Sequence, residues 1–129
     1  NSHIGLGFEE ICKQLIYDFK ELNKFNLIGK WWGYRRGEDN KRKGIEIDIV
    51  ALNEKAREIL FCECKWRDKV DALNVIKDLY EKTKFVKWHN DKRKETFAVF
   101  AKSFKKKINE FEGRKVYCYD IGDITKVLR

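Results

Sequence analysis

Two apolar segments of this chain each carry two charged residues that are two positions apart, and this alternation favours a strand for both segments. The predicted strands cover residues 45–52 and 59–66. Successive side chains of a strand point to opposite faces of its sheet, so each strand has one charged and one apolar face. The charged faces are expected to hold Glu46, Asp48, Glu63 and Lys65, and the opposite faces Ile45, Ile47, Ile49, Cys62 and Cys64.

The carboxylates in these strands favour a metal-dependent site. Burying a charge among apolar neighbours is costly unless the charge is paired, hydrogen-bonded or bound to metal. Asp48 and Glu63 supply the oxygen ligands that Mg²⁺ (or Mn²⁺) takes, and such a metal activates a water for phosphodiester hydrolysis. Lys65 is expected to position that water or to stabilise charge on the phosphoryl group. The alternative is a plain salt-bridge set on an exposed sheet face.

A predicted amphipathic helix at residues 4–24 supplies a further candidate. At 100° per residue, Glu9 falls on the rim of the apolar stripe and Glu10 on the solvent side. Glu9 is therefore expected to assist the acidic cluster as a catalytic residue or metal ligand, and the alternative is an ordinary charge near a helix N-terminus. The stripe consists of Phe8, Ile11, Cys12, Leu15, Phe19 and Leu22.

The remaining periodicity predicts one α/β domain over residues 1–129, with element order αβββαβαβα. A mixed central sheet of about five strands with helices on both faces follows from a meander and two later crossovers. The helix at 70–87 is expected to bury Ala72, Leu73, Ile76, Leu79, Tyr80, Thr83 and Val86 on one side. The other predicted elements are strands at 27–34, 96–101 and 116–119, a basic helix at 103–111 facing inward through Phe104, Ile108 and Phe111, and helical turns at 121–128.

The net charge of +8 favours an anionic partner such as DNA, although it is also compatible with a solubility role. The basic residues are clustered, and one cluster lies in the connection at 35–44. That connection is expected to lie along a phosphate backbone, or else to be a solvated hairpin tip. The candidate nucleic-acid-binding residues are Arg35, Arg36, Lys41, Arg42, Lys43, Trp66 and Arg67. Trp66 can alternatively cover the core.

Four cysteines and the apolar runs indicate a cytoplasmic protein. Cys62 and Cys64 form C-x-C, and no second pair with zinc-type spacing is present, which favours buried free thiols over metal or disulfide. No apolar run is long enough for a membrane span or a secretory signal, so no membrane association is expected. The chain contains no Met, and we therefore expect a piece of a longer protein.

These motifs resemble the PD-(D/E)xK superfamily, which includes restriction endonucleases and archaeal Holliday junction resolvases. The family pattern of a helix Glu, a strand Asp and E-x-K on the next strand is matched by Glu9, Asp48 and Glu63-Cys64-Lys65. Ile47 stands where the superfamily often has Pro. The runs at 29–33, 46–53 and 61–66 look like the nuclease-like domain of unknown function at the C-terminus of archaeal AAA-type ATPases.

The resemblance implies a restriction-endonuclease-like fold, and with it a Mg²⁺-dependent DNA endonuclease. It also implies an ATPase domain elsewhere in the same chain. Many superfamily members bind DNA without cutting it, so the alternative function is a non-catalytic DNA-binding or regulatory domain of such an ATPase. A weaker third alternative is a protein-interaction module. Nucleases of this class often act as dimers, and a homodimer stays open.

Overall fold

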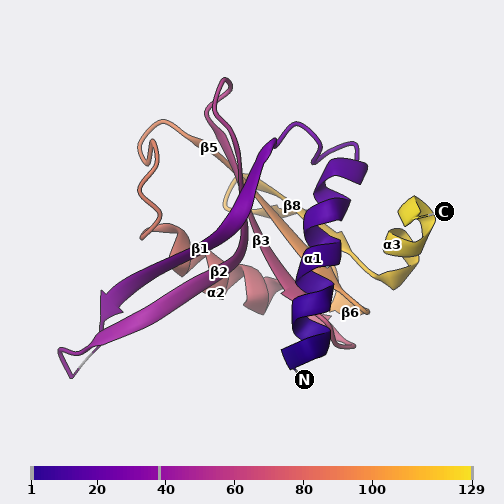
Figure 1. Cartoon of the computed structure of the whole chain (residues 1–129), viewed down its shortest axis with the longest axis horizontal. Coiled ribbons are helices and arrows are strands. Elements are labelled where there is room, and N and C mark those ends of the chain that lie inside the picture. Colours follow the sequence, from indigo (N-terminus) through magenta and orange to yellow (C-terminus); the bar gives the residue numbers. More distant parts are fainter. Residues whose placement is uncertain (1, 38, 129) are drawn as a thin grey trace.

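The computed structural model describes residues 2–37 and 39–128, which form a mixed α/β structure with three helices (Figure 1). Six strands make the central sheet in the order β1-β2-β3-β5-β8-β7, and β4 and β6 form a small second sheet. The elements are α1 (Ser2–Asp18), β1 (Leu27–Arg36), β2 (Arg42–Asn53), β3 (Glu58–Lys65), β4 (Val70–Asp71), α2 (Ala72–Thr83), β5 (Lys94–Ala101), β6 (Phe104–Lys106), β7 (Glu110–Phe111), β8 (Arg114–Tyr119) and α3 (Ile121–Leu128).

The central sheet is mixed, as the sequence predicts. Strands β1, β2 and β3 are an antiparallel meander, whereas β5 is parallel to both β3 and β8. The crossover from β3 to β5 contains α2, which packs on the sheet face opposite α1 (Figure 1). The central strands β3 and β5 are buried on both faces over most of their length, and accordingly contain the continuous apolar runs 59–62 and 97–101.

Two hydrophobic clusters, one on each face of the sheet, hold the helices in place. In the first cluster, Phe8, Cys12, Leu15 and Ile16 of α1 pack on the α1-facing residues of β3 and β5. The cluster under α2 includes Val75, Ile76, Leu79, Phe61 and Phe97. Each fully buried aliphatic or aromatic side chain contributes about 1.5–3 kcal/mol. Two residues expected in the helix stripes, Ile11 and Leu73, are instead exposed at the margins of their helices.

The basic helix predicted at 103–111 is wrong, because these residues form β6, β7 and their connections. The backbone N–H of Val70 donates to Ser103 O, and β6 continues this contact by pairing in parallel with β4. Strand β7 turns back onto β8 through Glu112 and Gly113, whose φ angles of 48° and 79° lie in the left-handed region. Phe104, Ile108 and Phe111 do face inward, since all three are partly buried against the α2-side cluster.

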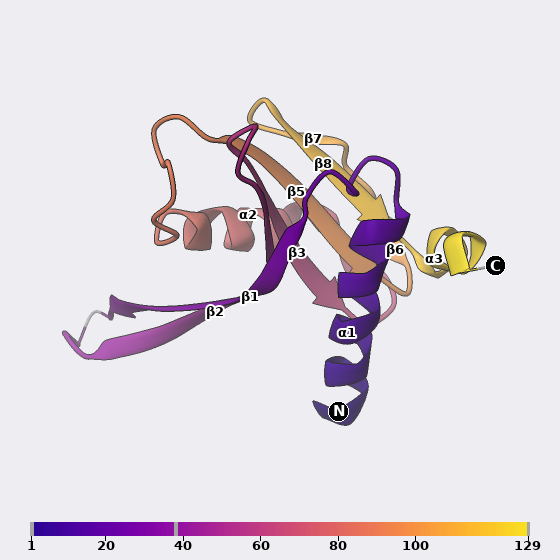
Figure 2. The same ribbon diagram turned by 45° about the horizontal axis from the view of Figure 1, so that its top comes forward.

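The first two strands extend beyond the rest of the sheet as a two-stranded arm (Figures 1 and 2). Pairing of β2 with β3 ends at Ile49 and Cys62, whereas pairing of β1 with β2 continues to Arg36 and Arg42. We call residues 31–36 and 42–47 the arm. The sequence predicted a loop over most of its tip, but both strands continue into that region. Among the described helices, none has the length and apolar character needed to span a bilayer.

Candidate active site

The site lies where β2 and β3 separate at the base of the arm. Beyond the last β2–β3 pair, Asp48 and Glu63 face the opening between the two strands. The backbone N–H of Cys64 donates a hydrogen bond of 2.9 Å to Oδ2 of Asp48, so a side chain replaces the backbone ladder at this point. The separation of the strands therefore brings the predicted Asp and Glu together.

A β-bulge sets the direction of the Asp48 side chain. Opposite Lys30 of β1, strand β2 supplies two residues, Asp48 and Ile49. As a result, Ile47 belongs to the α2-side cluster and Ile49 to the α1-side cluster. The expectation that these two isoleucines share a face is therefore wrong, because strict alternation is interrupted by the extra residue. Bulges of this kind commonly re-aim a side chain beside an active site.

Glu63 is the most buried acidic residue of the site, with an exposed fraction of 4%. Burial, followed by the hydrogen bond with Asp48 and the negative charge of Asp48, raises the pKa of Glu63 to about 8. Lys82 of α2 opposes this shift from 3.2 Å away, and Lys65 does so more weakly. Glu63 therefore holds its proton more tightly than an exposed carboxyl group does.

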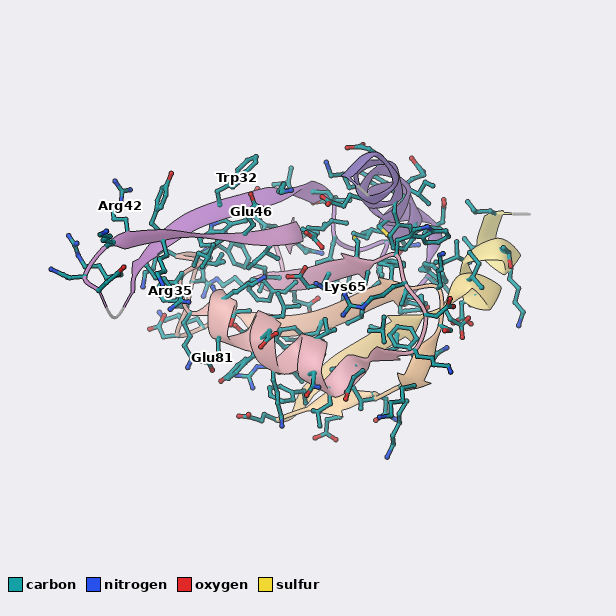
Figure 3. The ribbon with its side chains drawn as sticks, turned by 90° about the horizontal axis from the view of Figure 1, so that it is seen from below. Trp32, Arg35, Arg42, Glu46, Lys65 and Glu81 are labelled. Carbon is teal, nitrogen blue, oxygen red and sulfur yellow. The ribbon has the colours of Figure 1, made fainter. Side chains whose placement is uncertain are left out.

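Lys65 shares the groove with Glu63, as the strand alternation predicts. One groove of about 680 Å³ runs between α2 and the arm and is lined by Arg35, Glu63, Lys65 and Arg67. Figure 3 shows Lys65 in the space between β3 and α2, and Arg35 on the side of the arm that faces α2. A second groove of about 610 Å³ connects Asp48, Glu63, Lys65 and Lys82 with the arm. On the other face of β3, Cys62 and Cys64 lie toward α1.

Glu9 approaches the site from the α1 side of the sheet. Its Oε1 lies 3.4 Å from Nζ of Lys30, which is also 3.8 Å from Oε2 of Glu46. The structure therefore links Glu9 to Glu46 of the arm through Lys30. The periodicity argument did place Glu9 correctly at the helix–sheet boundary, where it is half-buried.

The predicted nucleic-acid-binding residues fall into two groups. On the arm and its tip, Arg35, Arg36, Lys41, Arg42 and Lys43 are all exposed, and Arg67 is exposed at the groove beyond Lys65. Trp66, by contrast, packs on Phe8 with ring centroids 4.8 Å apart. Nζ of Lys102 lies 4.7 Å from the Trp66 ring centroid. These contacts match the alternative in which Trp66 covers the core.

Two lysines of the site, Lys30 and Lys82, were not found from the sequence. Lys30 had a signal, because it is a single basic residue within the apolar run of β1. Lys82 carries no such signal in the sequence, because a lysine in the last turn of a helix is usually an ordinary surface residue. Only the packing of α2 brings Lys82 to Glu63.

All four cysteines are free thiols; Cys12 and Cys62 are buried as expected, whereas Cys64 and Cys118 are half-buried. Cys12 of α1 meets Cys62 and Cys64 of β3 in the α1-side core, and burial raises the pKa of Cys62 well above its usual range. Throughout the described part of the chain, no three His, Cys, Asp or Glu side chains are grouped closely enough to hold a metal by themselves.

Fold and site together define a mixed α/β domain with a paired-carboxylate groove. A family model, DUF234, described as "Archaea bacterial proteins of unknown function", matches residues 1–76, and the chain belongs to this family. An uncharacterized protein of Methanocaldococcus jannaschii, MJECL04, is 34% identical over 131 residues. That alignment covers 97% of this chain but 26% of the relative, so the chain spans about a quarter of the relative's length. No solved structure matches the chain at a significant level.

Proposed function

We propose that this chain is a metal-dependent endonuclease-type domain of restriction-endonuclease-like fold that hydrolyses phosphodiester bonds of DNA. One observation carries the proposal: the carboxylates of Asp48 and the buried Glu63 line one groove together with the ammonium group of Lys65. A buried pair of carboxylates is unfavourable by itself, and it is explained if the pair binds a cation.

The residues present fit Mg²⁺ or Mn²⁺. Mg²⁺ is commonly held by one or two carboxylates, with water and substrate phosphate oxygens at its other positions. Asp48 and Glu63 supply two such ligands in one groove. When bound, the metal supplies Lewis acidity toward the phosphoryl oxygen and lowers the pKa of a coordinated water.

The other residues of the site have separate roles in this proposal. Lys65 directs its ammonium group into the groove, where it orients the attacking water or stabilises negative charge on the phosphoryl group. Lys82 neutralises part of the charge on Glu63. Glu9 acts as a positioning residue, because its ion pair fixes Lys30 beside the bulge that carries Asp48.

The alternative is a non-catalytic DNA-binding or regulatory domain of an archaeal ATPase. The exposed basic residues of the arm favour it, since phosphate contacts of this kind need no catalytic site. The greater length of the M. jannaschii relative leaves room for an ATPase domain in the same chain. Under either function, we expect the domain to bind DNA in the cytoplasm, as a monomer or a homodimer.

Cleavage assays distinguish the two functions. Supercoiled, linear and branched DNA are incubated with the wild-type chain and Mg²⁺ or Mn²⁺, beside Asp48→Ala, Lys65→Ala and the surface control Lys55→Ala. The endonuclease proposal predicts metal-dependent nicking that is lost in the two site variants and retained in Lys55→Ala. DNA binding with a steep salt dependence but without cleavage by any of the four proteins would support the alternative.

A further inference from the structure

Two aromatic side chains stand exposed on the same face of the arm. Trp32 and Tyr34 are 65% and 62% exposed, although the protein has a large apolar core that other aromatic residues fill. They are two positions apart in β1, which places their Cα atoms about 6.6–6.8 Å apart on one side of the strand. The neighbouring Trp31 points the other way and packs against the α2-side cluster.

A cation lies over each ring, and Trp32 also makes a hydrogen bond, while both rings stay accessible. The guanidinium carbon of Arg42 lies 4.1 Å from the Tyr34 ring centroid, and Nζ of Lys30 lies 5.9 Å from that of Trp32. Nε1 of Trp32 donates a hydrogen bond of 3.0 Å to Glu46. In Figure 3, Trp32 and Arg42 rise from the same side of the arm.

The surface beside Tyr34 is open. Gly44 is its partner in β2, and a Cβ added to Gly44 would meet no atom within 4 Å. A flat ligand can therefore approach the ring without contacting a side chain at this position. Arg42, two residues from Gly44 toward the tip, supplies positive charge next to that space.

The aromatic surface is continuous with the candidate active site. Trp32, Tyr34 and Gly44 line the same groove of about 610 Å³ as Asp48 and Lys65. A polymer lying over the two rings would thus have its next units directed toward the paired carboxylates.

We propose that the arm binds an unpaired segment of DNA, whose bases stack on Trp32 and Tyr34 and whose phosphates contact the basic residues of the arm. Stacking on aromatic rings is available to unpaired bases, because duplex bases already cover one another's faces. The delivery of this strand to Asp48 and Glu63 rests on the proposed function, whereas the binding itself does not. A second copy of the chain fits the arm poorly, because the basic residues of two arms would repel each other. The basic residues are Arg35, Arg36, Arg42 and Lys43 in the arm and Lys41 at its tip.

Fluorescence anisotropy in EDTA tests the proposal without involving catalysis. The 129-residue chain is titrated into labelled oligo(dT) and into a blunt duplex of equal length. Trp32→Ala and Tyr34→Ala are each expected to weaken oligo(dT) binding roughly 5- to 150-fold, the worth of one stacked base, while duplex binding changes less than about twofold. The control Tyr17→Ala, which removes a ring 51% exposed on α1, is expected to bind like wild type.

Several results would overturn the proposal. These are unchanged oligo(dT) binding in both arm variants, an equal loss for single-stranded and duplex DNA, or a dimer that dissociates on Trp32→Ala while DNA binding persists. Circular dichroism establishes that the variants are folded. Selective loss of oligo(dT) binding in a chain that never cleaves DNA keeps the arm proposal and removes the nuclease. Metal-dependent cleavage that is unchanged in both arm variants, together with unchanged oligo(dT) binding, keeps the nuclease proposal and removes the arm proposal.

Discussion

The backbone N–H of Cys64 donates a hydrogen bond of 2.9 Å to the carboxylate of Asp48, although the two residues lie in different strands that have stopped pairing. Strand β3 therefore carries Glu63 and also fixes the position of its acidic partner. Because Cys64 lies between Glu63 and Lys65, one short strand segment orients three groups of the candidate active site.

Replacing Asp48 tests this hydrogen bond separately from metal binding. Asp48→Ala leaves the part-buried N–H of Cys64 without its acceptor, a loss of about 1–3 kcal/mol in the free energy of unfolding. Asp48→Asn keeps a side-chain oxygen and is expected to lose much less. Both variants remove the same charge, so both should lose affinity for Mg²⁺. Urea denaturation and calorimetric Mg²⁺ titration measure the two effects, and equal stability of the two variants would contradict the role assigned to the hydrogen bond.

The raised pKa of Glu63 predicts a stability that falls as the pH increases. The folded chain holds this proton more tightly than the unfolded chain, because burial and Asp48 raise the pKa from 4.5 to about 8. The resulting stabilisation is complete below pH 4.5 and is lost as the pH rises through 8. At about 1.4 kcal/mol per pKa unit, the loss is on the order of a few kcal/mol.

Glu63→Gln should flatten this pH dependence, which urea denaturation across the same window would detect. The exposed Glu81 provides the control, since Glu81→Gln is expected to leave the slope unchanged. Mg²⁺ should restore stability at high pH if it binds the ionised pair, because a ligand of the folded state stabilises it. A wild-type slope in Glu63→Gln would show that Glu63 is not the group responsible.

Strand periodicity predicted Asp48, Glu63 and Lys65 as site residues because charged residues two positions apart within an apolar run have few structural explanations. The same reasoning failed at Ile47 and Ile49, since a bulge depends on pairing with β1 and leaves no trace in β2 itself. Alternation therefore predicted that Asp48, Glu63 and Lys65 lie together, as they do in one groove, but not the backbone feature that directs Asp48.

Long-range contacts account for the remaining differences. The stretch at 103–111 has helix-like apolar spacing, but Ser103 and the residues after it meet the β4 backbone, and this pairing decides their conformation. Lys82 reaches Glu63 across 19 residues of sequence, a distance over which neither propensity nor spacing is informative. Features that depend on local alternation, such as the charged faces of the strands, can be predicted from the sequence. Features that depend on contacts between distant elements, such as β6 and the Lys82–Glu63 pair, cannot.

A buried arginine is expected to dominate the stability of the α2–β5 connection. Arg93 is 3% exposed, forms an ion pair of 2.9 Å with Glu95, and donates hydrogen bonds to the carbonyl oxygens of Thr83, Val86 and Trp88. Arg93→Met leaves these groups without a donor and should cost about 3–5 kcal/mol. The measurement is thermal or urea unfolding.

The exposed pair of Lys84 and Glu81 is the matched control for Arg93. Its nitrogen and oxygen atoms are 3.0 Å apart, at a spacing of three residues. Lys84→Met should change stability by no more than about 1 kcal/mol, because exposed pairs are weak. If Arg93→Met were as mild, the carbonyl groups would have to find water, and the structural role of Arg93 would be disproved.

The base of the arm depends on a glycine that lies against a tryptophan ring. A Cβ at Gly33 would collide with the ring of Trp31, which packs on the α2-side cluster. Gly33→Ala must displace that ring, at a cost of about 1–3 kcal/mol, and should increase hydrogen exchange in the arm. Gly44→Ala is the control, since its Cβ meets nothing within 4 Å. Equal stability and exchange in the two variants would mean that the Trp31 ring moves freely and does not brace the arm.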